Sequence, residues 1–365
     1  MKLRLLVDSA EFREAVAADL ASARRSAFVQ ALTFEGDSAG RDMAGLLLAS
    51  PARDRSVLID AFTRHVLSDR FRWWPRNLVS AALWREAFAT GRMVREMRRQ
   101  GALVRFVNPA GACFRRFPAR NHKKLVAVDG RVAYVGGINF SDHNFAWHDL
   151  MLRIEDERAA AFLHEDFLAT WAGHDALGSL RLPGLTLHTL DGRQNERVFE
   201  EVLDLLASAR HEIFLECPYV TDPFSKELER AARRGVKVSV VTAERHNFPL
   251  LREALVHAAA RAPLDLRLYP GRMTHVKALL VDASRLVLGS ANFDVWSYHS
   301  QQEYLLVASE PGIIEDFRRR VAEPDLACST PLAPGAARDG RGLEARLAGL
   351  ALLASLGARA RLGKP

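Results

Sequence analysis

Two histidine–lysine pairs are the residues of this chain with the clearest chemical potential. His122 is followed by Lys124, and the same pair recurs in the second half of the chain as His275 and Lys277. Residues two apart in a β-strand point to the same face, so each imidazole is expected beside an ammonium group. An imidazole can act as nucleophile, acid or base near neutral pH, and an ammonium group stabilises negative charge. The pairs therefore predict chemistry at an anionic centre such as a phosphodiester.

The residues around the two pairs are copies of one motif. Segments 122–140 and 275–293 align without a gap and share seven identities. These include Asp129 and Asp282, five positions after each lysine, and Asn139 and Asn292, near the end of each copy. An internal duplication is the natural explanation. Each asparagine amide is expected to donate a further hydrogen bond to a bound phosphate.

The duplication extends over whole domains. A second pair of similar segments, 20–29 and 206–215, lies upstream of the two motif copies. Strands alternate with helical stretches in both halves, which predicts an α/β fold built twice. We expect the first domain at 1–178, the second at 184–323, and a C-terminal tail at 324–365 that is helical, over 343–362, or disordered.

The upstream segments are further apart in the chain than the two motif copies are, so the first domain carries extra residues. We place this insertion at about 63–100, a segment with Phe71-Arg-Trp-Trp-Pro75, Trp84 and many arginines. Tryptophan and arginine together are typical of the boundary between water and lipid. An amphipathic helix packed on its own domain is the equally supported alternative.

The amino-acid composition and net charge limit the classes of protein to which this chain could belong. A hydrophobic fraction of 48% and a charged fraction of 26% are typical of a globular chain, and no stretch has the length and apolarity of a membrane span. Three scattered cysteines predict neither a disulfide framework nor a cysteine metal site. A net charge of +7 favours polyanionic partners, either nucleic acid or an anionic lipid surface.

The two copies resemble the phospholipase D superfamily, whose signature is His-x-Lys-x4-Asp-x6-Gly-Ser/Gly-x-Asn, over roughly residues 5–322. The Gly-Gly-Ile-Asn sequence at 136–139 is most similar to the cardiolipin synthase branch. The resemblance implies two similar phospholipase D-like domains, each an α/β/α sandwich with a mixed β-sheet flanked by helices. It further implies a pseudo-twofold axis, one shared active site, and a reaction without metal or cofactor.

The resemblance also implies a role for each shared residue. His122 would attack phosphorus to give a phosphohistidine, and His275 would protonate the leaving alkoxide and then activate the incoming water or alcohol. Sequence symmetry leaves the reverse assignment of the two histidines open. The other positions are the phosphate clamps Lys124 and Lys277, the phosphate donors Asn139, Asn292 and Ser290, the ring-orienting carboxylates Asp149 and Glu303, and the motif residues Asp129 and Asp282, which are expected to brace it.

These features together favour a phosphatidyltransferase of cardiolipin synthase type. Its expected partners are a phospholipid substrate and the anionic surface of the membrane, with the chain cytoplasmic and peripheral on the inner face. The alternatives are hydrolysis of phospholipid or of nucleic acid through the same intermediate. A catalytically inactive binding module is disfavoured, because histidine, lysine and asparagine are intact in both copies. Two motifs in one chain remove the need for a dimer, so a monomer is expected.

Overall fold

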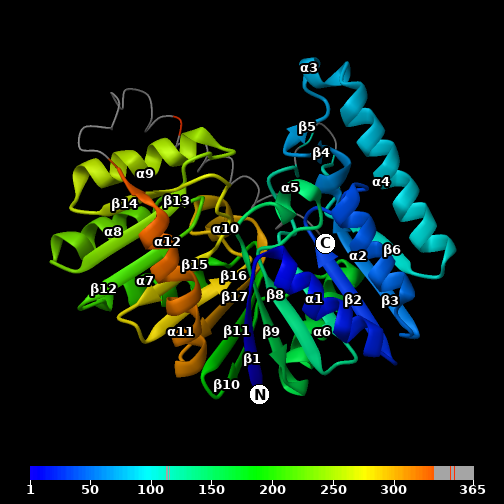
Figure 1. The fold of residues 1–365 in the computed structure, drawn as a ribbon, viewed down its shortest axis with the longest axis horizontal. Coiled ribbons are helices and arrows are strands. Elements are labelled where there is room, and N and C mark those ends of the chain that lie inside the picture. Colours follow the sequence, from blue (N-terminus) through cyan, green and yellow to red (C-terminus); the bar gives the residue numbers. More distant parts are fainter. Residues whose placement is uncertain (112–113, 115, 333–345, 347–348, 350–365) are drawn as a thin grey trace. The chain divides into compact units, whose positions relative to one another are not determined.

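The computed structural model describes residues 1–111, 114, 116–332, 346 and 349 of the chain. They form two compact units, divided between Ala176 and Leu177. Each unit is a mixed β-sheet with helices packed on both faces (Figure 1). The predicted α/β class and its construction from two similar domains are therefore confirmed.

The first unit contains a seven-stranded sheet in the order β1-β9-β8-β7-β2-β3-β6. Strands β2, β3 and β6 are parallel, and the other neighbours pair antiparallel. In chain order its elements are β1 (Lys2–Val7), α1 (Asp8–Ser22), β2 (Ser26–Ala31), α2 (Ser38–Ala49), β3 (Asp54–Asp60), the 3-10 helix η1 (Ala61–Arg64), β4 (Val66–Leu67), β5 (Arg70–Phe71), α3 (Pro75–Leu78), α4 (Ala81–Arg99), β6 (Leu103–Val107), β7 (Leu125–Val128), β8 (Val132–Gly136), α5 (Asp142–Phe145), β9 (Leu150–Glu155) and α6 (Glu157–Ala172).

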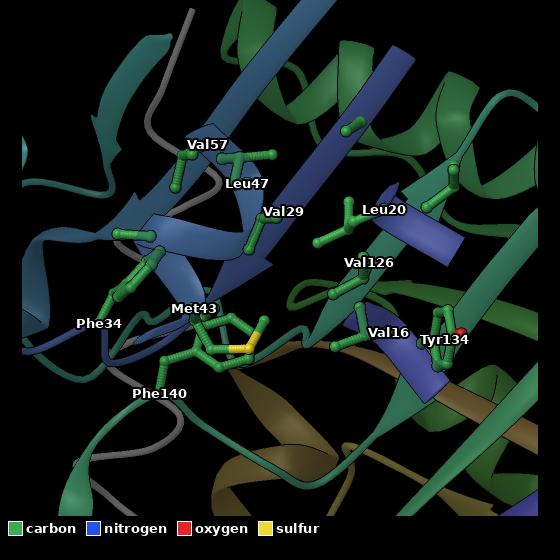
Figure 2. Packing of buried hydrophobic residues seen from close by; sticks show 14 of the residues in the cluster. Val16, Leu20, Val29, Phe34, Met43, Leu47, Val57, Val126, Tyr134 and Phe140 are labelled. Atoms are coloured by element: carbon green, nitrogen blue, oxygen red, sulfur yellow. The ribbon is translucent and has the colours of Figure 1, made fainter. Parts of the chain in front are cut away.

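Both faces of this sheet are apolar, which explains why its central strands are buried without alternation. In β2, Ala27 and Val29 contribute to a cluster with side chains of α1, α2 and α4. Phe28 faces the opposite way and packs on α6, where its ring centroid lies 5.0 Å from that of Phe167. Figure 2 shows side chains of α1, α2 and the strands interdigitating in the first cluster. Each fully buried Val or Leu contributes roughly 1.5–3 kcal/mol.

The second unit repeats this arrangement in a nine-stranded sheet with the order β10-β11-β17-β16-β15-β12-β13-β14-β18. Seven of its strands, from β11 to β14 in this order, correspond one by one to the seven strands of the first sheet. In chain order its elements are β10 (Gly178–Leu182), β11 (Leu185–Asp191), α7 (Glu196–Ser208), β12 (Glu212–Glu216), α8 (Phe224–Arg233), β13 (Lys237–Ala243), α9 (Pro249–Arg261), β14 (Asp265–Tyr269), β15 (Ala278–Val281), β16 (Arg285–Gly289), α10 (Val295–His299), β17 (Gln302–Ala308), α11 (Pro311–Phe317), the π-helix η3 (Arg318–Ala322), α12 (Glu323–Cys328) and β18 (Thr330–Pro331).

The extra residues of the first unit are divided between two places. The connection from β3 to β6 covers 61–102, whereas the equivalent connection from β13 to β14 covers only 244–264. The connection from β6 to β7 covers 108–124, whereas that from β14 to β15 covers only 270–277. The larger share therefore falls in the predicted segment, where η1, β4, β5 and α3 have no counterpart in the second unit and α4, with 19 residues, is longer than α9, with 13. A smaller share lies in the loop that leads to His122, which the sequence comparison alone did not locate.

The ends of the second sheet also differ from the sequence expectation. Residues 179–183, which lie between the two expected domains, belong to β10 and the turn after it, and β10 pairs antiparallel with β11. The start of the expected tail forms α12 and β18, which pairs with β14. The helix expected at 343–362 lies outside the described residues, apart from two single positions. None of the described helices is long and apolar enough to cross a bilayer.

Candidate active site

Each histidine of the repeated motif lies just before a central, fully buried strand. β7 lies between β2 and β8, and β15 between β12 and β16. His122 and His275 are nearly buried, with 6% and 4% of their surface exposed. In each copy the lysine Nζ donates to the carbonyl oxygen of the histidine at 2.6 Å, Lys124 to His122 and Lys277 to His275. Each ammonium group therefore lies against the backbone of its own histidine.

The residue between histidine and lysine faces the opposite side of the sheet. Lys123 is fully buried, and its Nζ donates to both carboxylate oxygens of Asp166 on α6, each at 2.7 Å. Val276, its counterpart, is fully buried without a charge. The alternation of side chains along an extended segment places no constraint on the residue type between the histidine and the lysine. In the first unit this residue instead forms a buried ion pair that joins the motif strand to the helix on the opposite face.

A loop after β8 brings further motif residues to the same edge of the first sheet as His122. Register pairs Leu125 with Val135, so the end of β8 lies beside the start of β7. Gly136 pairs with Met151, which places Asp149 at the same edge. Gly137 approaches Asp149 so closely that a Cβ on it would lie 2.2 Å from Oδ1. A side chain at 137 would therefore have to displace the Asp149 carboxylate, whereas the second copy has serine at the equivalent position.

In the second unit the equivalent serine, Ser290, was expected to donate to the phosphate, but its hydroxyl hydrogen is directed to the carboxylate of Glu303 instead. Ser290 Oγ donates to Glu303 Oε2 at 2.5 Å, and Ser297 Oγ donates to Oε1 at 3.0 Å. The backbone N–H of Tyr304 donates to Ser290 Oγ at 2.9 Å. Glu303 is fully buried, so these hydrogen bonds fix an acceptor in the interior at the edge of the sheet where His275 lies.

Both motif asparagines lie near the end of a neighbouring strand. Asn139 Oδ1 accepts from the backbone N–H of Thr33 at 3.3 Å. Asn292 Oδ1 lies 3.9 Å from Cys217 Sγ, and the single hydrogen of this thiol is directed to the nearer carbonyl oxygen of Tyr219, at 3.2 Å. Burial raises the pKa of Cys217 to about 12, so this thiol stays neutral and is a hydrogen-bond donor. The contact with Thr33 fixes the carbonyl end of the Asn139 amide, so its NH2 end is the donor, as a phosphate-binding role requires.

Asp129 and Asp282 lie at the other end of the motif strands. Asp129 accepts hydrogen bonds from the backbone N–H groups of Arg24, Arg25 and Ser26. Asp282 binds the equivalent three residues of the second unit in the same way, at 210–212. Four strand residues lie between each motif lysine and its aspartate, which makes five steps of about 3.3 Å each. These contacts fit the expected bracing role and place both aspartates away from the histidines.

The segment that leads to His122 is held by a second buried ion pair. Arg120 Nη1 lies 2.8 Å from Asp60 Oδ1, and both side chains are buried. Asp60 Oδ2 accepts from the backbone N–H of Asn121 at 2.6 Å. Asp60 ends β3, so this pair fixes the approach to the histidine from a neighbouring strand. Arg120 thus has a structural partner, although its place in the sequence is also compatible with the mouth of a site.

Comparison with known proteins agrees with this geometry. The chain matches the family described as "Cardiolipin synthase, PLD-like domain" over residues 16–171 and 202–323. It is 24% identical to cardiolipin synthase B of Escherichia coli K12 over 322 residues, covering 80% of this chain and 73% of that protein. It is 27% identical to cardiolipin synthase A of Pseudomonas aeruginosa PAO1 over 371 residues, covering 94% and 70%.

A solved structure shows the same fold over both units. The phosphatidylserine synthase of Haemophilus influenzae Rd KW20 superposes with a TM-score of 0.71 and 16% sequence identity. The superposition covers 97% of this chain and 95% of that chain. At this identity the likeness supports the architecture, and the chemistry has to be argued from the residues.

Proposed function

Because the chain belongs to the cardiolipin synthase, PLD-like domain family and is thus an enzyme of the phospholipase D superfamily, we propose that it is a phosphatidyltransferase. It transfers a phosphatidyl group from one phospholipid to the hydroxyl of a second lipid or of a small alcohol. The observation that carries this proposal is the repetition of histidine, lysine and asparagine at equivalent edges of two equivalent sheets.

The proposed reaction has two displacements at one phosphorus atom, with a histidine from each unit. His122 Nε2 attacks phosphorus, an N–P bond forms, and the P–O bond to the leaving headgroup breaks. His275 donates a proton to the leaving alkoxide oxygen. It then takes a proton from the incoming hydroxyl, whose oxygen attacks phosphorus and releases His122. Atoms and protons balance over the two steps with these groups alone.

The remaining motif residues have roles that follow from their charge and orientation. Lys124 and Lys277 stabilise the charge that develops on the non-bridging oxygens, and the NH2 groups of Asn139 and Asn292 donate to the same oxygens. Asp149 and Glu303 are proposed to orient the imidazoles, since a carboxylate on one ring nitrogen fixes the tautomer and stabilises the imidazolium.

A lipid substrate is supported by the names of the matched relatives, which are cardiolipin synthases, and by the exposed tryptophans of the insertion. We place the protein as a peripheral enzyme on the inner face of the cytoplasmic membrane, active as a monomer. Hydrolysis is the second candidate, because water can discharge the same phosphohistidine. A nuclease is a weaker third, supported only by the net charge of +7.

The test is to incubate the full chain with labelled phosphatidylglycerol vesicles, with and without glycerol, and separately with single-stranded DNA. We expect a phosphatidyl adduct on the wild-type chain by mass, and its loss in His122→Ala. The matched control is His174→Ala, an exposed histidine outside both motifs. Phosphatidic acid as the sole lipid product would favour hydrolysis. DNA cleavage without lipid conversion would overturn the lipid assignment, and an adduct in His122→Ala would overturn the choice of nucleophile.

A further inference from the structure

The first unit contains a cavity of about 240 Å³ that the proposed reaction does not use. It lies between η1, β4 and β6 on one side and α4 on the other. Four arginines line it, together with apolar residues and a glycine of α4. The main lining residues are Arg64, Arg72, Arg95, Arg98, Phe106 and Gly91.

Within the described part of the chain, none of the four arginines forms an ion pair with an acidic side chain. Arg72 Nη1 donates to the carbonyl oxygen of Arg64 at 2.9 Å, and Arg98 Nη2 donates to a backbone carbonyl at 2.7 Å. Arg72 Nε is buried without a hydrogen-bond partner among the described residues. The ion pairs that arginines of this unit make involve Arg13, Arg99, Arg120 and Arg153 instead.

The close approach of these four guanidinium groups is unfavourable when no ligand is bound. Burial lowers the pKa of the Arg64 guanidinium, and the positive charge of Arg98 lowers it further. Burial also lowers the pKa of Arg72. Arg64, Arg95 and Arg98 are exposed, so water screens part of the repulsion between these like charges, and a bound anion removes the rest of that cost. A planar guanidinium also matches the oxygens of a phosphate in two parallel hydrogen bonds.

Beside the cavity is a group of exposed apolar side chains around α3 and on the first half of α4, which we call the apolar tip. In Figure 1 these helices extend beyond the end of the sheet in the first unit. The tip consists of Trp73, Trp74, Leu78, Val79 and Phe88, with 43%, 56%, 45%, 86% and 68% of their surface exposed. Grouped apolar residues at this exposure are rare on surfaces that contact water alone.

The cavity and the apolar tip are continuous. The Arg72 guanidinium lies 4.5 Å from the ring centroid of Trp84 and 5.4 Å from that of Trp73. The indole N–H of Trp73 donates to His65 Nδ1 at 3.0 Å, so the indole is held by hydrogen bonding as well as by stacking. The segment 70–85 contains four arginines and no acidic residue.

The cavity also lies at the catalytic edge of its sheet. η1 begins directly after Asp60, which binds the backbone just before His122. A lipid held there would lie on the same edge of the first sheet as one of the two reactive histidines. The volume is below the about 300–1,000 Å³ of pockets that enclose a drug-sized ligand, so it fits a headgroup and not a whole lipid.

We propose that the four arginines bind the phosphate of an anionic phospholipid headgroup while the apolar tip inserts among the acyl chains of the same leaflet. This inference rests on the proposed function for its choice of a membrane, and it identifies the surface by which the enzyme docks there. The alternative occupants of the cavity, free phosphate and nucleic acid, are separated by the test.

The test measures binding of the full chain to phosphatidylcholine vesicles with and without phosphatidylglycerol, by flotation. Arg64→Gln/Arg95→Gln is expected to weaken binding to the anionic vesicles about 30-fold. The matched control removes two exposed arginines at the opposite edge of the same sheet, Arg53→Gln/Arg131→Gln, and is expected to stay within about twofold because of screening. Equal losses in both double variants would overturn the proposal, since net charge alone would then explain binding.

A second variant blocks the cavity without removing charge. Gly91 lies in α4, and a Cβ on it would be 3.4 Å from Arg95 Nη1, so Gly91→Leu fills the space while the helix is retained. We expect the same loss of vesicle binding, with thermal unfolding at or above the wild-type temperature. Retained binding in a folded Gly91→Leu chain would rule out the cavity as the headgroup site.

The apolar tip is tested by fluorescence. Lipids brominated in the acyl chains should quench the tryptophans of the wild-type chain, and Trp74→Ser/Val79→Ser should reduce both quenching and binding. Leu168→Ser, an exposed leucine on α6, is the control and should change neither. Quenching that is the same in the tip variant and in the wild type would overturn insertion at this tip.

The remaining measurements show whether the bound phosphate group comes from a lipid, from free phosphate or from DNA. They also distinguish failure of the docking site from failure of the proposed function. Saturable binding of inorganic phosphate or single-stranded DNA that depends on Arg64 and Arg95, with no vesicle binding, would overturn the lipid assignment. The inactive His122→Ala chain should bind vesicles as tightly as the wild type. If the wild-type chain binds in the predicted manner but transfers no lipid, the docking site stands and the proposed function fails.

Discussion

Ser290 Oγ and Glu303 Oε2 are 2.5 Å apart in the second unit, whereas the first unit has no room for the same contact. There a Cβ on Gly137 would lie 2.2 Å from Oδ1 of Asp149. The two motifs thus hold their carboxylates differently. One carboxylate is held by hydroxyl groups and the other is packed directly against backbone, so the two edges are related by fold but not by detailed contacts.

This difference predicts distinct outcomes for exchanging the two residues. Gly137→Ser should destabilise the chain by about 1–3 kcal/mol, because the new side chain overlaps a carboxylate. Ser290→Gly has space but removes a hydrogen bond to buried Glu303, so it should lower kcat more than it changes KM, with a loss of about 1–3 kcal/mol in stability. Urea unfolding and steady-state kinetics measure both. A fully stable, active Gly137→Ser would contradict the packing described.

The buried pair of Lys123 and Asp166 predicts a large effect far from the reacting atoms. Lys123→Met leaves a buried carboxylate without its cation and should cost about 3–5 kcal/mol, whereas Lys123→Met/Asp166→Leu should recover most of the loss. Urea midpoints report the difference. The exposed pair of Arg13 and Asp42 is the control, and Arg13→Gln should cost no more than about 1 kcal/mol. Additive losses in the double variant would argue against the pair.

The environment of Glu35 leads us to expect that the free energy of unfolding falls as the pH rises. Burial, together with the nearby carboxyl group of Glu86, raises the pKa of Glu35 to about 10. The unfolded chain loses this proton near pH 4.3, so between about pH 5 and 10 the folded state holds a proton that the unfolded state has released. The folded pKa is the higher one, so the stabilisation is complete at low pH and is lost with rising pH.

Glu35→Gln should remove this dependence. Its stability relative to the wild type should increase with pH by up to about 1.4 kcal/mol per unit. Chemical denaturation between pH 5 and 9 tests the slope, with the exposed Glu14→Gln as control. Parallel curves for Glu35→Gln and the wild type would show that this carboxyl ionises in the folded protein as it does in the unfolded chain.

The motif spacing was sufficient to predict where the repeated residues lie in the fold. Period-two alternation puts histidine and lysine on one face, and an apolar run after the lysine predicts a buried central strand, which is what β7 and β15 are. The α/β class follows from the alternation of predicted strands and helices along the chain. The asparagines and the carboxylates at 149 and 303 reach the predicted edges because short antiparallel strands fix the register.

What the sequence could not predict depends on contacts between distant residues. Asp166 lies on a helix far along the chain from Lys123, and strand alternation shows only that Lys123 points away from its neighbours. The division of the extra residues could not be located, because two pairs of similar segments bound an insertion without placing its parts. For the insertion itself both predicted roles find support: α4 buries Met93 and Met97 on its own unit, while the apolar tip is exposed.

Asp129 and Asp282 provide a prediction that separates architecture from chemistry. Burial acts to raise the pKa of Asp129, but hydrogen bonds from the backbone of Ser26, Arg25 and Arg24 outweigh it and hold the pKa below its usual value. The depressed pKa means that this stabilisation is present above about pH 4 and is lost as the pH falls through the folded value. Asp129→Asn keeps the size of the side chain but weakens the three acceptor contacts.

Asp129→Asn should therefore lower the stability of the chain near pH 7 and have little effect below pH 3. Its kcat should stay close to that of the wild type at temperatures where both are folded, because the four residues of β7 separate Asp129 from Lys124. Asp282→Asn should behave alike, whereas Lys124→Met should lose activity. A large loss of kcat in a fully folded Asp129→Asn chain would show that Asp129 acts in the reaction itself and does not only brace the motif.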